Sequence, residues 1–199
     1  MRRLVILATL AAAAHFPPGA WPTGSSCLAD PAVELCVNGG FEEPLTVGWQ
    51  ATLPDSASSV TREAGCEPDP DYEVRLLKDH LTGCASLDQL LPFPGLDTHL
   101  SVRGQLWSES GSVSWSAAAI VIAFIDEGGL TLGETAFYTA SRWCPWESGP
   151  AFHAIEVPAG VWDTYTLDVA AELATHLPGV DADAVHGLRL SLRAVLDDC

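Results

Sequence analysis

Short apolar runs alternate with turn residues along most of the chain. From Cys36 onward, Gly, Pro, Asn, Asp and Ser separate these runs about every 8 to 15 positions, a rhythm typical of β-sandwiches and barrels. Residues 99–108 alternate strictly, with Leu100 and Val102 on one face and polar side chains on the other. Residues 117–126 form an apolar run that leads into a Glu-Gly-Gly turn, which indicates a central strand. The pattern predicts an all-β domain.

The remaining runs predict further strands, and one segment departs from the β pattern. Residues 168–176 have helical spacing and precede Pro178-Gly179, which stops a helix. Further strands are expected at 37–43, 49–53, 59–63, 72–78, 85–91, 135–143, 152–157, 162–167 and 186–197. The pattern therefore predicts antiparallel strands with one short helix before the last of them.

The start of the chain has a different pattern. Arg2 and Arg3 precede an uncharged apolar run over 4–14, and Pro17-Pro18-Gly19 breaks that run. This is the arrangement of a secretory signal peptide. The run is shorter than the about 20 residues that span a bilayer, so no transmembrane anchor is expected. We predict a secreted, periplasmic or cell-surface protein with three parts: a signal peptide over 1–20 cleaved after Ala14 or Ala20, a loose leader over 21–35, and a single domain over 36–199.

The net charge narrows the range of partners. The chain carries a formal charge of -17. Such a surface repels phosphate backbones, so nucleic acid is not expected as a partner. The same acidity suits solubility outside the cell or the binding of divalent cations. The mature chain of about 175 residues is long enough for one well-buried core.

Six cysteines follow the apolar run, and an even number in an oxidising compartment predicts disulfides. Their spacing is not that of a zinc site. Six cysteines allow 15 connectivities. Cys66 and Cys84 flank one polar loop and are paired first; the remaining pairs by elimination are Cys27 with Cys36 and Cys144 with Cys199. Gly24-Ser25-Ser26-Cys27 partly resembles a bacterial lipidation box, but it has glycine where a large aliphatic residue is expected, so lipidation is disfavoured.

Several short motifs occur in a characteristic order. Asn38-Gly39-Gly40-Phe41-Glu42 is followed by Gly48-Trp49, then by Gln89 in an apolar run, by Trp162-x-x-Tyr165-x-Leu167 and by Leu196-Asp197-Asp198. This order resembles that of galactose-binding-like jelly rolls of the carbohydrate-binding-module type. The likeness covers about residues 36–198. It implies an antiparallel jelly-roll β-sandwich of about eight to ten strands.

The resemblance also implies a structural calcium ion. In such modules, the glutamate after the first-strand phenylalanine and an aspartate of the last strand share the ion; here these are Glu42 and Asp197 or Asp198. Carboxylates are ligands that Ca²⁺ prefers. First and last strands pair in a jelly roll, so the two ends would meet. The alternative is a pair of solvated carboxylates at strand ends.

Tryptophans suggest a surface for a sugar ring, because pockets combine flat apolar walls with a few polar groups. Trp107 lies on the polar face of its strand with Arg103 and Gln105, and Trp143 and Trp146 bracket Cys144 in a loop. These residues are the candidate ligand surface. The alternative is that the tryptophans cap the core.

No catalytic residue is expected. His80, His99, His153, His176 and His186 are scattered, and none belongs to an H-E-x-x-H motif or neighbours a Gly-x-Ser-x-Gly elbow. The expected function is a secreted, non-catalytic binding module, with a glycan or cell-surface polymer as ligand. The alternatives are a structural or adhesive surface protein without a small-molecule ligand, and an enzyme of unrecognised type.

Overall fold

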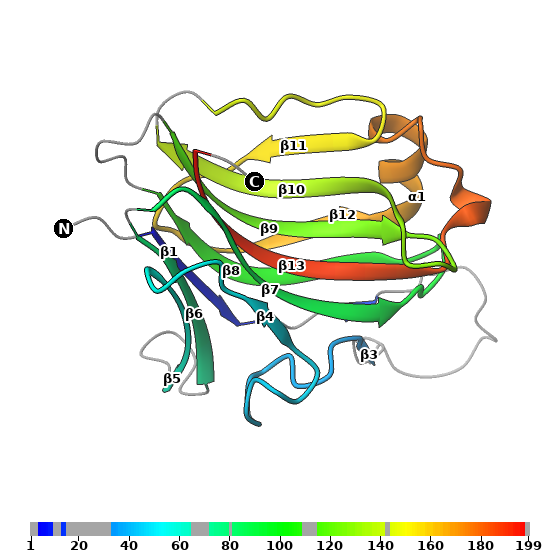
Figure 1. The fold of residues 1–199 in the computed structure, drawn as a ribbon. Coiled ribbons are helices and arrows are strands. Elements are labelled where there is room, and N and C mark those ends of the chain that lie inside the picture. Colours follow the sequence, from blue (N-terminus) through cyan, green and yellow to red (C-terminus); the bar gives the residue numbers. More distant parts are fainter. Residues whose placement is uncertain are drawn as a thin grey trace.

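A computed structural model of the chain describes residues 4–9, 13–14, 33–64, 72–79, 81–108, 115–141 and 144–197. Strands dominate these residues and form a five-stranded, a six-stranded and a two-stranded sheet (Figure 1). The strands are β1 (Leu4–Thr9), β2 (Ala13–Ala14), β3 (Val33–Glu34), β4 (Gln50–Thr52), β5 (Ser58–Ala64), β6 (Tyr72–Lys78), β7 (Gly83–Pro92), β8 (His99–Trp107), β9 (Ser116–Ile125), β10 (Thr131–Ser141), β11 (Phe152–Glu156), β12 (Trp162–Asp168) and β13 (Gly187–Leu196). The predicted β-rich fold is confirmed.

The five-stranded sheet has the order β12-β8-β1-β6-β5. Its middle strand, β1, comes from the segment that the sequence assigns to a signal peptide. It pairs antiparallel with β6 from Leu4 to Ala8 and with β8 from Val5 to Thr9. Cleavage of residues 1–20 would remove this strand and leave the facing edges of β6 and β8 without it. The signal peptide itself stays a prediction.

The six-stranded sheet has the order β11-β10-β9-β13-β7-β4 and is mixed. Its β10–β11 pair is parallel, with Glu134 opposite Phe152 and Tyr138 opposite Glu156, so the expectation of a purely antiparallel fold is wrong. A parallel neighbour requires the chain to run back along the sheet before the second strand begins. Residues 144–151 belong to that return segment, and it carries Trp146.

Apolar side chains from both large sheets form one core. Val74 and Leu106 from the five-stranded sheet and Leu87 and Leu188 from the six-stranded sheet belong to the same buried cluster. Every residue of β9 is buried, as its continuous apolar run predicts. The core therefore explains the strict alternation of β8 and the absence of alternation in β9, which is covered on both faces.

The segment 37–43 is a turn and not the expected first strand. Asn38 and Phe41 both have φ of 56°, a left-handed conformation that ends strand pairing. The Asn38 side chain holds the turn by accepting from the Glu43 amide at 2.8 Å and donating to the Glu43 carbonyl at 3.0 Å. Phe41 is fully buried, and its ring centroid lies 5.3 Å from that of Trp49. The turn is thus anchored in the core by its phenylalanine.

The predicted short helical segment is present before the last strand, and a second, 3-10 turn over Ala182–Ala184 follows it. α1 (Val169–Ala171) begins after Asp168, whose side chain accepts from the Ala171 amide, the usual way to satisfy a free helix-end amide. It continues as a π-helical turn over Glu172–His176. Among the described residues, no helix has the length and apolarity needed to cross a membrane.

An ion pair between a buried lysine and a partly exposed aspartate predicts how the stability of the fold changes with pH. Lys78 has no exposed side-chain surface and donates to Asp55 Oδ2 at 2.7 Å. Hydrogen bonding from Lys78 lowers the pKa of Asp55 below its ordinary value. The ionised Asp55 therefore stabilises the fold above its ordinary pKa, and this contribution is lost as the pH falls through the lowered value.

Asp55→Asn should consequently be less stable than the wild type at neutral pH, and the difference should shrink as the pH falls through the lowered pKa of Asp55. Urea-unfolding midpoints measured across this range test the expectation. A difference that is constant with pH would contradict it.

Candidate functional site

A polar groove crosses the outer face of the six-stranded sheet over β4, β7 and β13. It arises from strand alternation, because residues of β7 and β13 that do not face the core must face outward. The groove has a volume of about 630 Å³ and is lined by Gly48, Gln50, Thr52, Cys84, Ser86, Asp88, Leu90, Gly129, Arg189 and Arg193. Ser86 and Asp88 lie directly opposite Arg193 and Ser191 in the β7–β13 register. We call this set the polar groove.

Charged groups of the polar groove compensate one another. Both Nη atoms of Arg193 donate to the carboxylate of Glu134, at 3.0 and 2.6 Å. Arg189 donates to Thr131 Oγ1 at 2.9 Å and lies 3.5 Å from the same carboxylate. The carboxylate of Asp88 accepts from the hydroxyls of Ser86 and Ser191. The groove thus presents fixed donors and acceptors: its two arginines share the carboxylate of Glu134, and the carboxylate of Asp88 is held by two hydroxyls.

One apolar side chain stands beside these polar groups. Leu90 is 70% exposed, although it is a leucine within β7 and lies opposite Arg189 of β13. It faces the groove because its neighbours Gln89 and Leu91 face inward and are buried. The groove therefore joins one apolar patch to a row of polar groups, a combination that binding pockets share.

The structure brings Arg103, Gln105 and Trp107 together on the outer face of β8, in the other large sheet. Trp107 is 41% exposed and covers Gly160, where an added Cβ would lie 2.7 Å from the indole ring. Gln105 donates to the Gly160 carbonyl at 2.8 Å, and the Arg103 guanidinium lies 5.6 Å from the Trp162 ring. Gly160 therefore covers part of the Trp107 ring, and Arg103 covers part of the Trp162 ring.

Trp146 lies on the outer face of the six-stranded sheet, whereas Trp107 is on β8 of the five-stranded sheet. Its ring makes edge contacts with Trp115 at 6.4 Å, Tyr138 at 5.5 Å and Phe152 at 6.1 Å. It packs over small residues of β9 and β10, Ala119 among them. Trp143 lies outside the described residues. The described tryptophans of the candidate ligand surface therefore belong to two different sheets.

The predicted calcium ligands lie on separate elements. Glu42 is exposed, and its carbonyl accepts from Arg62. Asp197 follows β13 and its Oδ1 accepts from the Trp115 amide at 3.0 Å. The neighbours of β13 are β9 and β7, so the pairing of first and last strands on which the prediction rests is wrong for the described strands. Asp198 lies outside the described residues. Calcium stays a prediction.

The state of Cys144 contradicts one predicted disulfide. Cys144 is a free thiol, so the pair with Cys199 is wrong. Cys144 packs against the buried cluster of Trp115, Ala117 and Val195, and burial raises the pKa of its thiol. Cys84 is disulfide-bonded, but its predicted partner Cys66 lies outside the described residues, as do Cys27 and Cys199. The Cys66–Cys84 and Cys27–Cys36 pairs stay predictions, and Cys36 itself is buried in the main core.

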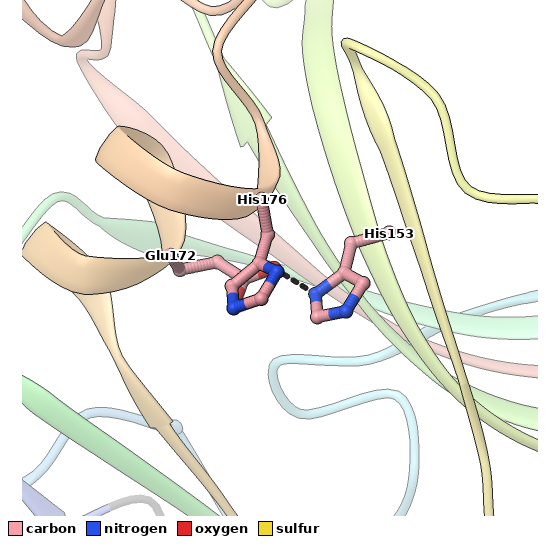
Figure 2. A group of neighbouring side chains, drawn as sticks. All are labelled: His153, Glu172 and His176. Carbon is pink, nitrogen blue, oxygen red and sulfur yellow. Dashed lines mark hydrogen bonds and ion pairs between the residues drawn. The ribbon is translucent and has the colours of Figure 1, made fainter.

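Two histidines and a glutamate meet between β11 and the π-helical turn (Figure 2). His153 Nδ1 lies 2.6 Å from Glu172 Oε1, and the rings of His153 and His176 stack at 4.1 Å. One potential ligand atom from each residue lies within 4.8 Å of the others. Part of this group could be predicted from the sequence, because Glu172 and His176 are four residues apart on a helical segment. His153 joins them only through the pairing of β11, which the sequence pattern does not specify.

Comparison with known proteins assigns no family to the chain. No protein-family model matches it, and no curated protein is significantly similar to it. Among solved structures, it is similar to the enzymatically active domain of tailspike protein 4 of bacteriophage CBA120, with 11% sequence identity and a TM-score of 0.31. The alignment covers 79% of this chain and 18% of the phage chain. At this level of similarity, the match is to a distant β-rich structure and supports no function for this chain.

Proposed function

We propose that this chain is a secreted, non-catalytic jelly-roll module that binds carbohydrate in the polar groove. The observation that carries the proposal is the fixed polar array, in which Arg189 and Arg193 share the carboxylate of Glu134 and two serine hydroxyls hold the carboxylate of Asp88. Groups held in this way offer hydrogen bonds in fixed directions with little net charge. Hydroxyl-rich, uncharged ligands need such an array, whereas an anion would need unpaired cations.

Leu90 adds to the proposal. Its 70% exposed side chain is the apolar patch against which the C–H face of a sugar ring can pack. Burial of an exposed leucine contributes to binding because apolar surface leaves water. The jelly-roll part of the proposal rests on the order of sequence motifs and on the single core shared by the two large sheets.

Glycan-array binding by the purified protein tests the proposal, with Arg189→Ala as the variant. Loss of a charged hydrogen-bond donor should weaken binding about 10- to 100-fold. Arg103→Ala is the matched control, because Arg103 is also a partly buried arginine but lies on the other large sheet. It should bind glycan as the wild type does. Binding should also change little with ionic strength.

The other outcomes distinguish the alternatives. Absence of glycan binding together with concentration-dependent self-association would favour an adhesive or structural role. Loss of binding in Arg103→Ala but not in Arg189→Ala would move the ligand to the face of β8 and overturn the assignment to the polar groove.

A further inference from the structure

We propose that His153, Glu172 and His176 form a site for a divalent transition metal, with Zn²⁺ as the best fit. The site lies away from the polar groove: none of its three residues lines that groove. The residues come from two elements that the fold holds side by side. His153 is on the edge strand β11, and Glu172 and His176 are one turn apart on the π-helical segment (Figure 2).

The residue types select the metal. Two imidazole nitrogens and one carboxylate oxygen suit Zn²⁺ and other first-row divalent ions, whereas Ca²⁺ is bound almost entirely by oxygen. Three protein ligands leave one position of a tetrahedral ion for water. The site therefore differs in chemistry as well as in place from the calcium that the sequence suggested at Glu42 and Asp197.

The geometry needs only a local adjustment to close on an ion. With metal–ligand bonds of about 2.0–2.2 Å, the ligand atoms of a tetrahedral site lie about 3.3–3.6 Å apart. Here these atoms lie within 4.8 Å of one another, and the closest pair is 2.6 Å apart. The imidazole rings are parallel, at 5°, so they must turn for both nitrogens to point at one ion. His176 is exposed and lies in the last turn of its segment, where its ring has room to turn.

The carboxylate is already oriented by the protein. Glu172 is 4% exposed, and its Oε1 accepts from the hydroxyl of the fully buried Thr135 at 2.6 Å. Metal-binding carboxylates are commonly held by such hydrogen bonds, which fix their direction before the ion arrives. Thr135 is on β10 and lies directly opposite His153 in the parallel β10–β11 pair. The strand pairing thus places the histidine and the residue that orients the glutamate next to each other.

Zinc titration of chelator-treated, full-length protein by calorimetry tests the proposal. The wild type should bind one Zn²⁺ per chain at this site, and His176→Ala should weaken the binding at least tenfold. His186→Ala is the matched control, because His186 is also exposed, and in the described hydrogen bonds its ring contacts only the Ala184 carbonyl. It should bind zinc as the wild type does. Excess Ca²⁺ should not compete.

A spectroscopic readout separates the site from adventitious binding. Co²⁺ in a four-coordinate site with nitrogen and oxygen ligands absorbs visible light strongly, and these bands should appear in the wild type and be lost in His176→Ala. All cysteines remain in this variant, so zinc held by thiols would still bind. Equal zinc affinity in the wild type and His176→Ala, or no uptake by the wild type at micromolar zinc, would overturn the proposal. Circular dichroism confirms that the variant is folded.

Discussion

Replacement of Gln89 by leucine is expected to lower the free energy of unfolding by about 3 kcal/mol. The Gln89 side chain is 3% exposed and links β7 to the turn segment before β4. Its Oε1 accepts from the Val37 amide at 2.8 Å, and its Nε2 donates to the Val37 carbonyl at 2.8 Å and the Gly48 carbonyl at 3.0 Å. Leucine fills similar space but leaves three backbone groups without these partners, each at a cost of about 1 kcal/mol.

The same variant should weaken ligand binding at the polar groove. Gly48 and Gln50 line that groove, and Gln89 fixes the backbone of Gly48 beside them. Gly48 has φ of +83°, and an added Cβ would lie 2.6 Å from Gln89 Nε2, so the contact between the two residues is close. Gln105→Leu is the control, because Gln105 makes one described backbone hydrogen bond. It should cost about 1 kcal/mol. Urea unfolding measures both values, and equal losses in the two variants would contradict the role of Gln89.

The positions of β4 to β13 could be predicted from the sequence because each follows a local pattern. β8 alternates and is buried on one face only, whereas β9 is continuously apolar and buried on both faces. The short helix was predictable for the same reason: Asp168 caps its start, and Pro178 follows its end. Patterns of this kind depend on residues that are close in sequence, so a single chain is enough to detect them.

The turn at 37–43 was not predictable from alternation. The pattern over residues 37–41 alternates well enough for a strand. Apart from the two glycines, Asn38 is the only residue in this segment that readily adopts a left-handed backbone. Phe41 adopts that conformation because its ring is buried against Trp49. The residues that carry the jelly-roll resemblance nevertheless meet: Trp49 Nε1 donates to the Asn38 carbonyl at 3.2 Å, and Gln89 holds Gly48. The order of these motifs therefore indicated which residues lie close together, although the strand predicted over 37–43 was wrong.

The direction of a strand is a long-range property, and both candidate sites depend on it. Alternation predicts β11 but does not say that it pairs in parallel with β10. That choice places His153 beside Glu172 and sends the 144–151 segment back over the sheet. Likewise, the polar groove requires β7 and β13 to be neighbours, although Asp88 and Ser191 are 103 residues apart. The sequence therefore named candidate residue types, while the topology decided which of them meet.

Trp146→Ala is expected to lower the free energy of unfolding by about 3 kcal/mol and to leave glycan binding by the folded protein unchanged. The sequence proposes Trp146 as a ligand residue, but its ring contacts Trp115, Tyr138 and Phe152 edge to face. Such aromatic pairs each contribute about 0.5–1.5 kcal/mol beyond the apolar area that they bury. Alanine would also expose the small side chains of β9 and β10 beneath the ring.

Trp107→Ala is the matched comparison, because Trp107 is 41% exposed and covers the single glycine at 160. Its removal should cost less stability than removal of Trp146, since fewer contacts and less buried area are lost. Thermal unfolding ranks the two variants, and glycan binding measured below the lower transition shows whether either ring touches the ligand. Unchanged stability together with lost glycan binding in Trp146→Ala would show that Trp146 belongs to the ligand-binding surface. A loss of stability alone would show that Trp146, in the segment between β10 and β11, covers part of the outer face of the six-stranded sheet. The part of that face over β4, β7 and β13 would then be the part open to a ligand.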